Sequence, residues 1–505
     1  MTAHAPPNIL IVMADQMAPA SLPIYGHSLV RAPNMQALAR DGIVFDSAYC
    51  ASPLCAPSRA SLMSGLLPSR TRVYDNAAEF AADVPTLAHA LRFRDYRTIL
   101  SGKMHFCGPD QLHGFEQRLT TDIYPADFNW TPDWDRPEHR PSWYHNMSSV
   151  RDAGLCVRSN QLDFDDETAF MAERAIFDLA RAKDQRPFLL VASFSHPHDP
   201  FAVQQRYWDL YRDEDIDMPA AGNALDAHSR RLRHVCAMDA EPVTEAQVRA
   251  ARRAYYGAIA YVDDLLGRLM QALRSAALAE DTIVILTSDH GEMLGERGLW
   301  YKMSFLEGAS RVPLVIASPG RFEPRRVASC VSLVDLMPTL IDLAGGNAQS
   351  PGIGVDGRSL APHLRGAGGH DEAIGEYLAE GAIAPMVMIR RGAYKFIHSP
   401  IDPDQLFDLS RDPSERDNLA DNPSCAGVVA DFRAEVGKRW DLAELDARIR
   451  DSQRRRRLVD AALNRGKIQS WDFQPFQKAS RQYVRNSMDL DDLEAMARFP
   501  PVVHR

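Results

Sequence analysis

The chain has 505 residues, of which 45% are hydrophobic and 25% charged, and these ordinary values exclude a disordered or fibrous protein. The formal net charge of −10 argues against nucleic acid as a partner, because proteins that bind phosphate backbones usually carry a basic face. No run approaches the roughly 18 apolar residues that would span a bilayer, so no membrane partner is expected.

Cysteine usage and the N-terminal segment bear on the compartment. The segment Met-Thr-Ala-His-Ala-Pro-Pro has no basic stretch followed by an apolar one, so no signal peptide is predicted. The seven cysteines are scattered and include no C-x-x-C pair, which argues against a disulfide framework and a zinc knuckle. We therefore expect a cytoplasmic protein.

Continuous apolar runs predict strands that are buried on both faces. Between them, a capping box at Thr244 and Gln247 starts a predicted helix that places residues 258, 262, 266, 269 and 273 on one apolar face. Strands alternating with helices predict an α/β architecture with a mostly parallel sheet between helices. The predicted strands are residues 8–13, 98–100, 187–194, 282–287 and 312–317.

The pattern changes after about residue 370. Short strands at 386–390, 394–398 and 405–409, with a turn at 391–393, predict a small antiparallel sheet. The basic run Arg454 to Arg457 is predicted to form a solvated helix face or a subunit contact. We divide the chain into a large α/β domain (1–370), an antiparallel β subdomain (371–445) and a helical, then irregular tail (446–505).

Polar side chains follow three of the predicted strands. Asp15 and Gln16 follow the first, His198 lies just past the strand at 187–194, and Asp289 and His290 follow the strand at 282–287. Because the carboxyl ends of parallel strands meet at one edge of a sheet, we expect these groups to converge. Two carboxylates and an imidazole suit a divalent cation such as calcium, magnesium or manganese.

A fourth cluster, Leu54-Cys55-Ala56-Pro57-Ser58-Arg59, leads into an apolar helix that ends at Gly65. Taken alone, such a cysteine would be a small buried hydrophobe. The C-x-P-S-R run with its helix and glycine, however, resembles the signature of type I sulfatases, in which the cysteine is oxidised to the aldehyde formylglycine. One departure is Ser64, where that family more often has threonine.

The resemblance implies an alkaline-phosphatase-like fold, a formylglycine made from Cys55 by the formylglycine-generating enzyme, and one divalent metal. We expect calcium, with manganese and magnesium as alternatives. Many family members have Asp in place of Gln16 and Asn in place of His290, but both departures are shared by the sub-branch of choline sulfatases and phosphonate monoester hydrolases. The metal ligands it implies are Asp15, Gln16, Cys55, Asp289 and His290, and the catalytic residues are Cys55, Arg59, Lys103, His105, His198 and Lys302.

Within that sub-branch, long stretches resemble choline sulfatases, which implies choline O-sulfate as the substrate. A quaternary ammonium has no hydrogen to donate, so its site must use aromatic faces and a nearby carboxylate. The resemblance assigns Trp130 and Glu380 to this pocket, with Asn76 and His145 as further candidates. The aromatic tail implies a homo-tetramer. The similar stretches are residues 67–76, 102–134, 195–200, 288–311 and 471–486.

The expected mechanism begins with a hydroxyl of hydrated formylglycine attacking sulfur, with Arg59 orienting it. The departing choline oxygen is strongly basic, so His198 or Lys302 is expected to protonate it. His105 is the expected base of the second step, in which sulfate leaves and the aldehyde returns.

Two kinds of alternative stay open. A phosphonate monoester hydrolase, phosphodiester hydrolase or aryl sulfatase would use the same scaffold and nucleophile with a different pocket. A catalytically silent binding protein would keep Cys55 unmodified, and mass spectrometry of the peptide that contains this residue would detect it.

Overall fold

The computed structural model describes residues 6–220, 225–346 and 354–467. Residues 1–462 form one compact unit, and residues 463–505 are grouped as a second. The similar stretch at 471–486, and most of the tail predicted at 446–505, lie outside the described residues.

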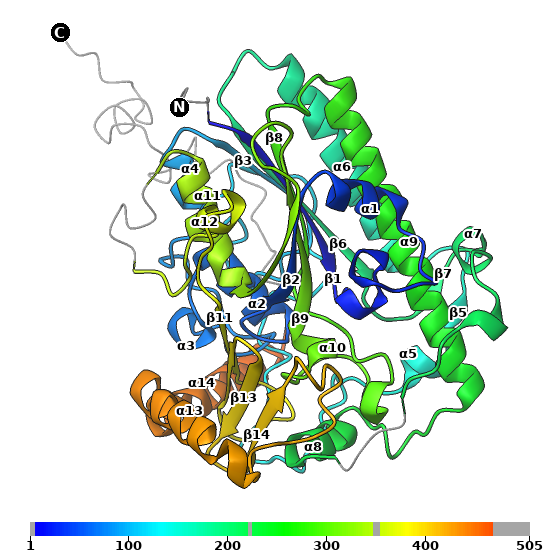
Figure 1. Cartoon of the computed structure of the whole chain (residues 1–505). Helices are drawn as coiled ribbons and strands as arrows, with labels where there is room; N and C mark the ends of the chain where they lie inside the picture. Colours follow the sequence, from blue (N-terminus) through cyan, green and yellow to red (C-terminus); the bar gives the residue numbers. More distant parts are fainter. Residues whose placement is uncertain (1–5, 221–224, 347–353, 468–505) are drawn as a thin grey trace, which may run out of the picture. The chain divides into compact units, whose positions relative to one another are not determined.

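The larger sheet has eight strands among the described residues, in the order β10-β2-β9-β8-β1-β6-β3-β4 (Figure 1). Neighbouring strands run parallel, except that β9 is antiparallel to both β2 and β8. The predicted mostly parallel sheet is therefore confirmed. Its strands are β1 (Asn8–Asp15), β2 (Ile43–Tyr49), β3 (Arg97–Gly102), β4 (Gln117–Arg118), β6 (Phe188–Pro197), β8 (Thr282–Ser288), β9 (Arg311–Ala317) and β10 (Arg325–Ser332).

Side chains of β1 alternate between two cores, because successive residues of a strand point to opposite faces. Leu10 and Val12 belong to the core that includes α6 (Asn160–Arg181) and α9 (Glu245–Ser275). Ile9 and Ile11 belong to the core that includes α2 (Cys55–Ser64), α4 (Leu87–Arg92) and α11 (Leu336–Leu343). Helices therefore cover both faces of the sheet (Figure 1), which is why β1 is apolar at every position from Ile9 to Ala14.

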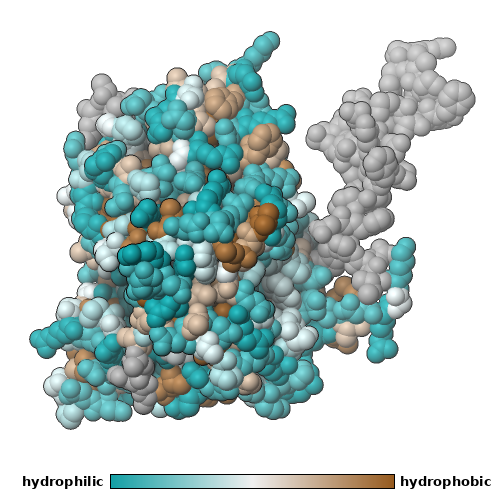
Figure 2. Space-filling view, turned by 90° about the vertical axis from the view of Figure 1, so that its right-hand side faces the viewer, coloured by the Kyte–Doolittle hydropathy of each residue, from teal (hydrophilic) through white to brown (hydrophobic). Residues whose placement is uncertain are grey.

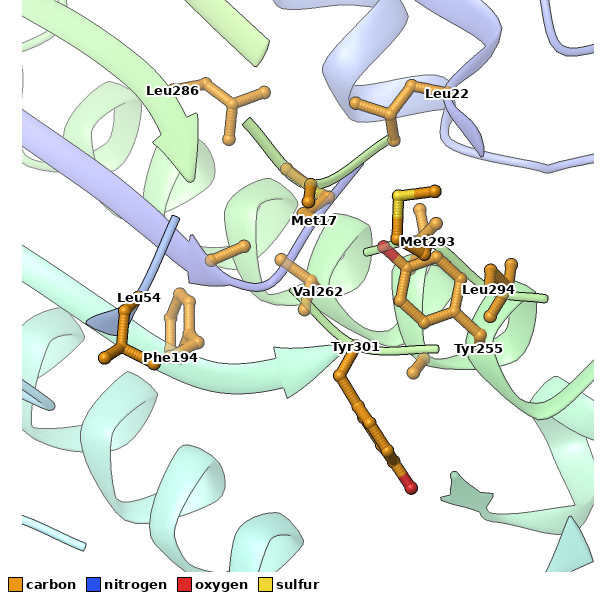
Figure 3. Packing of buried hydrophobic residues seen from close by; sticks show 14 of the residues in the cluster. Met17, Leu22, Leu54, Phe194, Tyr255, Val262, Leu286, Met293, Leu294 and Tyr301 are labelled. Carbon is orange, nitrogen blue, oxygen red and sulfur yellow. The ribbon is translucent and has the colours of Figure 1, made fainter. Parts of the chain in front are cut away.

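The long helix α9 begins where the sequence predicts it. Thr244 and Gln247 form the reciprocal capping bonds of a capping box. The predicted apolar face of α9 is buried, and Figure 3 shows Val262 of this face with Met17 and Phe194, which come from distant parts of the sequence. The packing of α9 fixes the loop after β1, which carries the first polar residues of the site.

The smaller sheet is antiparallel, as predicted, with strands β11 (Glu372–Tyr377), β12 (Met386–Arg391), β13 (Tyr394–Ser399) and β14 (Asp402–Asp408) in that order. Helix α13 (Ala426–Arg439) covers it through a separate core that includes Val387 and the stacked pair Phe396 and Phe432, whose ring centroids are 5.4 Å apart. The turn between β12 and β13 contains Gly392 with φ of 55°, a conformation that glycine adopts without strain.

Strands β2, β10 and β11 are not among the predicted strands. The apolar run of β2 is broken by Asp46 and Ser47, both half-buried, and β10 begins with Arg325 and Arg326. Because these strands pair near the edge of the sheet or in the smaller sheet, their sequences lack the uninterrupted apolar run that identifies a fully covered strand.

The surface in Figure 2 is mainly hydrophilic, with small separate hydrophobic areas. Among the described residues, no helix combines the length and the apolar character that crossing a bilayer requires. The remaining labelled elements are α1 (Pro33–Arg40), α3 (Pro68–Thr71), α5 (Ser148–Arg151), α7 (Gln205–Trp208), α8 (Ala227–Val235), α10 (Glu307–Ser310), α12 (Ala361–Leu364), α14 (Leu442–Leu463), β5 (Gly154–Leu155) and β7 (Ala202–Val203).

Candidate active site

The carboxyl ends of β1 and β8 meet the start of α2. One potential ligand atom from each of Asp15, Cys55, Asp289 and His290 lies within 4.8 Å of the others, and all four residues are buried. The Cys55 Sγ is 3.2 Å from the His290 Nε2. The structure thus brings together four of the five predicted metal ligands.

Cys55 is the first residue of α2, whose ten residues are all buried. The Asn76 side chain accepts a hydrogen bond from the Ala56 backbone N–H at 2.9 Å, which satisfies one amide of the first turn. Burial raises the pKa of the Cys55 thiol, but the charges of Lys103, Lys302 and His290 outweigh it and hold that pKa well below its usual range. The position therefore favours a negatively charged oxygen or sulfur.

Arg59 lies one helical turn after Cys55, with its side chain fully buried. Its guanidinium donates to Asp289 Oδ2 at 2.8 Å and to Asp15 Oδ2 at 3.0 Å. It also donates to the Lys103 carbonyl at 2.6 Å and to Ser193 Oγ at 2.8 Å. Arg59 therefore fixes the two carboxylates relative to each other.

Lys103 and His105 follow the end of β3. Lys103 forms a buried ion pair with Asp15, and its ammonium lies 4.1 Å from the centroid of the Tyr124 ring. His105 has φ of 54°, a region that non-glycine residues rarely adopt, and such strain is often found at functional sites. Neither ring nitrogen of His105 has a hydrogen-bond partner among the described residues.

Lys302 connects three further predicted residues. Its Nζ is 2.6 Å from the Gln16 side-chain oxygen, 2.7 Å from His198 Nε2 and 3.4 Å from His145 Nε2. The other end of the Gln16 amide donates to the Glu292 carboxylate. The Gln16 side chain therefore faces Lys302 and Glu292, while its backbone N–H donates to Asp289 Oδ1 of the four-residue group at 3.1 Å.

A cavity of about 250 Å³ opens onto Cys55 and Lys302. Part of its lining is aromatic: the rings of Trp130 and Trp143 stack with centroids 6.4 Å apart and an 18° interplanar angle, and the Tyr124 centroid lies 5.3 Å from that of Trp130. Glu380 also lines the cavity, and burial raises the pKa of its carboxyl to about 7. The predicted residues that line this cavity are Cys55, Asn76, Trp130, His145, His198, Lys302 and Glu380.

The four-residue group fits a divalent cation. Asp15 Oδ1 is buried without a hydrogen-bond partner among the described residues, although buried polar atoms are normally paired. Two carboxylates with one imidazole give a set of mainly oxygen donors, which calcium, magnesium and manganese accept. The Cys55 thiol is the fourth candidate ligand of this group.

Several residues of the site are not predicted from the sequence. Asp199 accepts from His198 Nδ1 through its backbone carbonyl at 2.7 Å, and Tyr124 and Ser149 line the cavity. Asp199 directly follows a predicted residue, and that proximity is a signal that could have been used. Tyr124 lies in an irregular part of the similar stretch 102–134, and Ser149 lies in the short helix α5; neither follows a predicted strand, so neither is singled out.

The basic run Arg454 to Arg457 differs from its prediction. Arg456 is buried and makes two bonds with Asp75, of 2.7 and 2.6 Å. Arg457 pairs with Asp133, a buried residue, and Arg454 with Asp135. The prediction of a solvated face or subunit contact is therefore wrong for Arg456, because carboxylates from distant segments pack against this helix.

Three family models match the chain. Residues 7–346 match the model described as Sulfatase, and residues 295–440 match N-sulphoglucosamine sulphohydrolase, C-terminal. Residues 447–499 match Choline sulfatase enzyme C terminal. The first match covers more than half of the chain.

Individual proteins give the same result. The Choline-sulfatase of Rhizobium meliloti (strain 1021) is 48% identical over 505 residues, with 98% of each chain covered. The Iduronate 2-sulfatase of Homo sapiens is 31% identical and covers 67% of this chain and 69% of its own. The solved Phosphonate Monoester Hydrolase of Agrobacterium radiobacter superposes with a TM-score of 0.68 at 28% identity, covering 88% of this chain and 96% of its own.

Proposed function

The chain belongs to the sulfatase family and is a sulfuric ester hydrolase, and from this premise we propose that its substrate is choline O-sulfate. One observation carries the proposal: a single cavity joins the cations around Cys55 to an aromatic wall with a buried carboxylate. Choline O-sulfate carries an anion at one end and a quaternary ammonium at the other. The similarity to a choline-sulfatase supports the same substrate.

Two groups would complete the site. Oxidation of Cys55 by a formylglycine-generating enzyme would supply an aldehyde hydrate as the nucleophile, and a divalent ion would neutralise charge on the sulfate. The unpartnered Asp15 Oδ1 supports the ion, for which calcium is our first choice. Its proposed protein ligands are Asp15, Gln16, Asp289 and His290, together with residue 55.

Arg59 and Lys103 prepare the anionic end of the site. The bonds of Arg59 to Asp15 and Asp289 hold both carboxylates in one orientation. The Lys103 ammonium is fixed by Asp15 and by the face of Tyr124. Cations held in place in this way stabilise negative charge that develops in a transition state, because they need no reorganisation during the reaction.

Lys302 and His198 are the proposed donors of a proton to the departing choline oxygen. The backbone carbonyl of Asp199 accepts from His198 Nδ1, which directs His198 Nε2 toward Lys302. General acids of this kind contribute about 10²–10⁴-fold in rate. His105 is the proposed base, since both of its ring nitrogens are left without partners inside the site.

The cation end uses Trp130, Trp143 and Glu380. An ammonium over an aromatic face gains about 0.5–2 kcal/mol, the larger value applying when water is excluded. The Glu380 Oε2 has no hydrogen-bond partner among the described residues, so it is free to face the charge of a bound ligand. Asn76 and His145 line the same cavity and contribute polar groups to it.

The test is a comparison of three substrates with enzyme co-expressed with a formylglycine-generating enzyme. We expect kcat/KM for choline O-sulfate to exceed that for an aryl sulfate and a phenyl phosphonate monoester by at least about a hundredfold, or about 2.7 kcal/mol. Trp130→Ala and Glu380→Ala should abolish this preference, whereas Trp208→Ala, remote from the cavity, should not. An unchanged preference in both cavity variants would contradict the cation pocket.

A phosphonate monoester hydrolase is the second candidate, favoured by the structural similarity to such an enzyme. Equal or higher turnover of the phosphonate would establish it and exclude choline O-sulfate as the preferred substrate. A binding protein with unmodified Cys55 would show the unoxidised peptide mass at residue 55 and no turnover.

The proposal extends to assembly and location. We propose a homo-tetramer, which light scattering coupled to size-exclusion chromatography measures directly. We also propose a cytoplasmic location, which cell fractionation tests.

A further inference from the structure

Helix α14 contacts three chain segments that form the cation end of the cavity. Its Gln453 accepts from the Trp134 backbone N–H at 2.9 Å, and its Arg450 donates to the Trp134 carbonyl at 2.8 Å. Arg450 also donates to the Ile383 carbonyl at 2.7 Å, close to Glu380. The helix thus lies behind the segments that carry Trp130 and Glu380.

Arg456 is the most buried cation of this helix. Its two terminal nitrogens donate to both oxygens of Asp75, at 2.7 and 2.6 Å, across 381 positions of the sequence. One of them also donates to the Thr131 hydroxyl at 3.1 Å. Asp75 has no exposed surface and Arg456 only 6%. Such a two-bond pair fixes direction as well as distance.

Both partners of Arg456 adjoin residues that line the cavity. Asp75 precedes Asn76, whose side chain accepts from the Ala56 backbone N–H at the start of α2. Thr131 follows Trp130, and its hydroxyl donates to the Phe128 carbonyl at 2.7 Å. One guanidinium therefore connects the segment beside Cys55 to the loop that carries the aromatic wall.

A structural role alone would not require a charge here. Burying an ion pair usually gains little over a well-packed apolar pair, because desolvation offsets the attraction. The pair nevertheless sits against the one wall of the cavity that must hold a rigid aromatic ring for a cation. Removing its positive member would leave the Asp75 charge buried and unpaired next to Asn76.

We propose that Arg456, through Asp75 and Thr131, is a positioning residue that holds the cation-binding wall of the cavity in its binding geometry. The inference rests on the proposed function, since it assigns α14 to recognition of the ammonium end of the substrate. Arg456 does not line the cavity and takes no part in the chemistry at residue 55.

The test uses the full-length, co-expressed enzyme in the forms Arg456→Met, Arg456→Lys and Arg454→Met. Arg454 is the matched control, because it is an exposed arginine of the same helix paired with Asp135. We expect Arg456→Met to raise KM for choline O-sulfate by at least about tenfold, with kcat and the kcat/KM for an aryl sulfate within about threefold. Arg456→Lys should recover part of the loss, and Arg454→Met should show none.

Hydrogen–deuterium exchange supplies a readout that needs no substrate. In Arg456→Met the peptide spanning residues 125–134 should exchange faster, while β1 peptides keep the wild-type rate. If Arg456→Met does not fold, Thr131→Val removes the bond from Arg456 together with the hydroxyl bond to the Phe128 carbonyl, keeps the Arg456–Asp75 pair, and should produce the same KM change in smaller measure.

The outcomes separate the two proposals. A wild-type enzyme without preference for choline O-sulfate overturns the proposed function, and the exchange of residues 125–134 then decides the role of Arg456. A parallel loss of choline O-sulfate and aryl sulfate activity, or unchanged exchange of that peptide, overturns the positioning role.

Discussion

Two buried groups of charged side chains differ in how completely their atoms are paired. The site cluster consists of Asp15, Asp289, Arg59 and Lys103 at the edge of the parallel sheet. The bracing cluster consists of Lys395, Glu307, Glu415, Tyr49 and Arg390, between the smaller sheet and α10. Both contain fully buried cations, so burial alone does not distinguish function from support.

The charges of the bracing cluster are paired with one another, although Glu307 and Glu415 also line a second cavity of about 250 Å³. The Lys395 ammonium contacts Glu307 at 2.6 Å, Glu415 at 2.8 Å and the Phe305 carbonyl at 2.8 Å. The second Glu415 oxygen accepts from the Glu307 backbone N–H at 2.7 Å. Each charge finds its complement inside the protein, as buried charges require.

The site cluster is left incomplete. Asp15 Oδ1 and both nitrogens of the adjacent His105 have no hydrogen-bond partner among the described residues, and the cavity opens at Cys55 beside them. The comparison teaches that buried charge alone does not mark a ligand site, and that unpartnered polar atoms do so only where, as here, they gather beside a cavity. Each prediction below tests one side of this difference.

The largest expected effect is a loss of turnover on substitution of Lys302, which lies beside the site cluster. Lys302→Met should lower kcat for choline O-sulfate by about 10³–10⁴-fold, because it removes a proposed proton donor and its bond to His198. The melting temperature should change little, since the lysine is not part of a closed ion network. Steady-state sulfate release and calorimetry measure the two quantities. If Lys302→Met lost stability as well as activity, the proposed difference between the site cluster and the bracing cluster would be contradicted.

At the bracing cluster we expect a substitution to lower stability while turnover is kept. Lys395→Met should lower the free energy of unfolding by about 3–5 kcal/mol, because Glu307 and Glu415 are left buried without their cation. Denaturant unfolding measures this change. The folded fraction should keep kcat within about threefold. A Lys395→Met enzyme that is stable but inactive would show that this cluster also serves catalysis.

A smaller effect, on the stabilisation that a bound metal ion gives, should also distinguish the site cluster from the bracing cluster. Calcium or manganese at about a hundred times Kd should stabilise the wild-type enzyme by about 2.7 kcal/mol. Asp15→Asn should abolish this stabilisation, whereas Lys395→Met should retain it, since Lys395 is not close to any of the proposed metal ligands in the group around Cys55. Thermal shift with and without a chelator measures both, and equal shifts in all three proteins would exclude Asp15 as a ligand.

The smallest effect concerns pH and the Glu380 carboxyl, whose burial raises its pKa to about 7. The ammonium end of the substrate favours the ionised carboxylate, so protonation below pH 7 competes with binding. KM for choline O-sulfate should therefore rise by up to about tenfold per unit as pH falls below 7, with no matching change for an aryl sulfate. Glu380→Gln should have a higher KM without this pH dependence. A sloping profile in that variant would assign the titration elsewhere.

Much of the fold, and the residues around Cys55, could be predicted because both depend on the spacing of residues along short stretches of the sequence. A strand covered on both faces must be apolar throughout, so β1, β6 and β8 were identifiable, and the polar residues after them had to meet at one sheet edge. Strands β2 and β10 were not predicted, because polar residues are tolerated on faces that are only partly covered.

The sequence by itself determined that Cys55 and Arg59 share one helix face and that Asp15 and Asp289 follow buried strands, since helix and strand patterns fix these positions. Only the tertiary structure decided that Gln16 turns toward Lys302 and that Arg456 meets Asp75 behind the aromatic wall. Contacts between distant segments depend on how the whole chain buries its apolar surface. No local pattern encodes them, because the free energy that selects them is summed over the entire core.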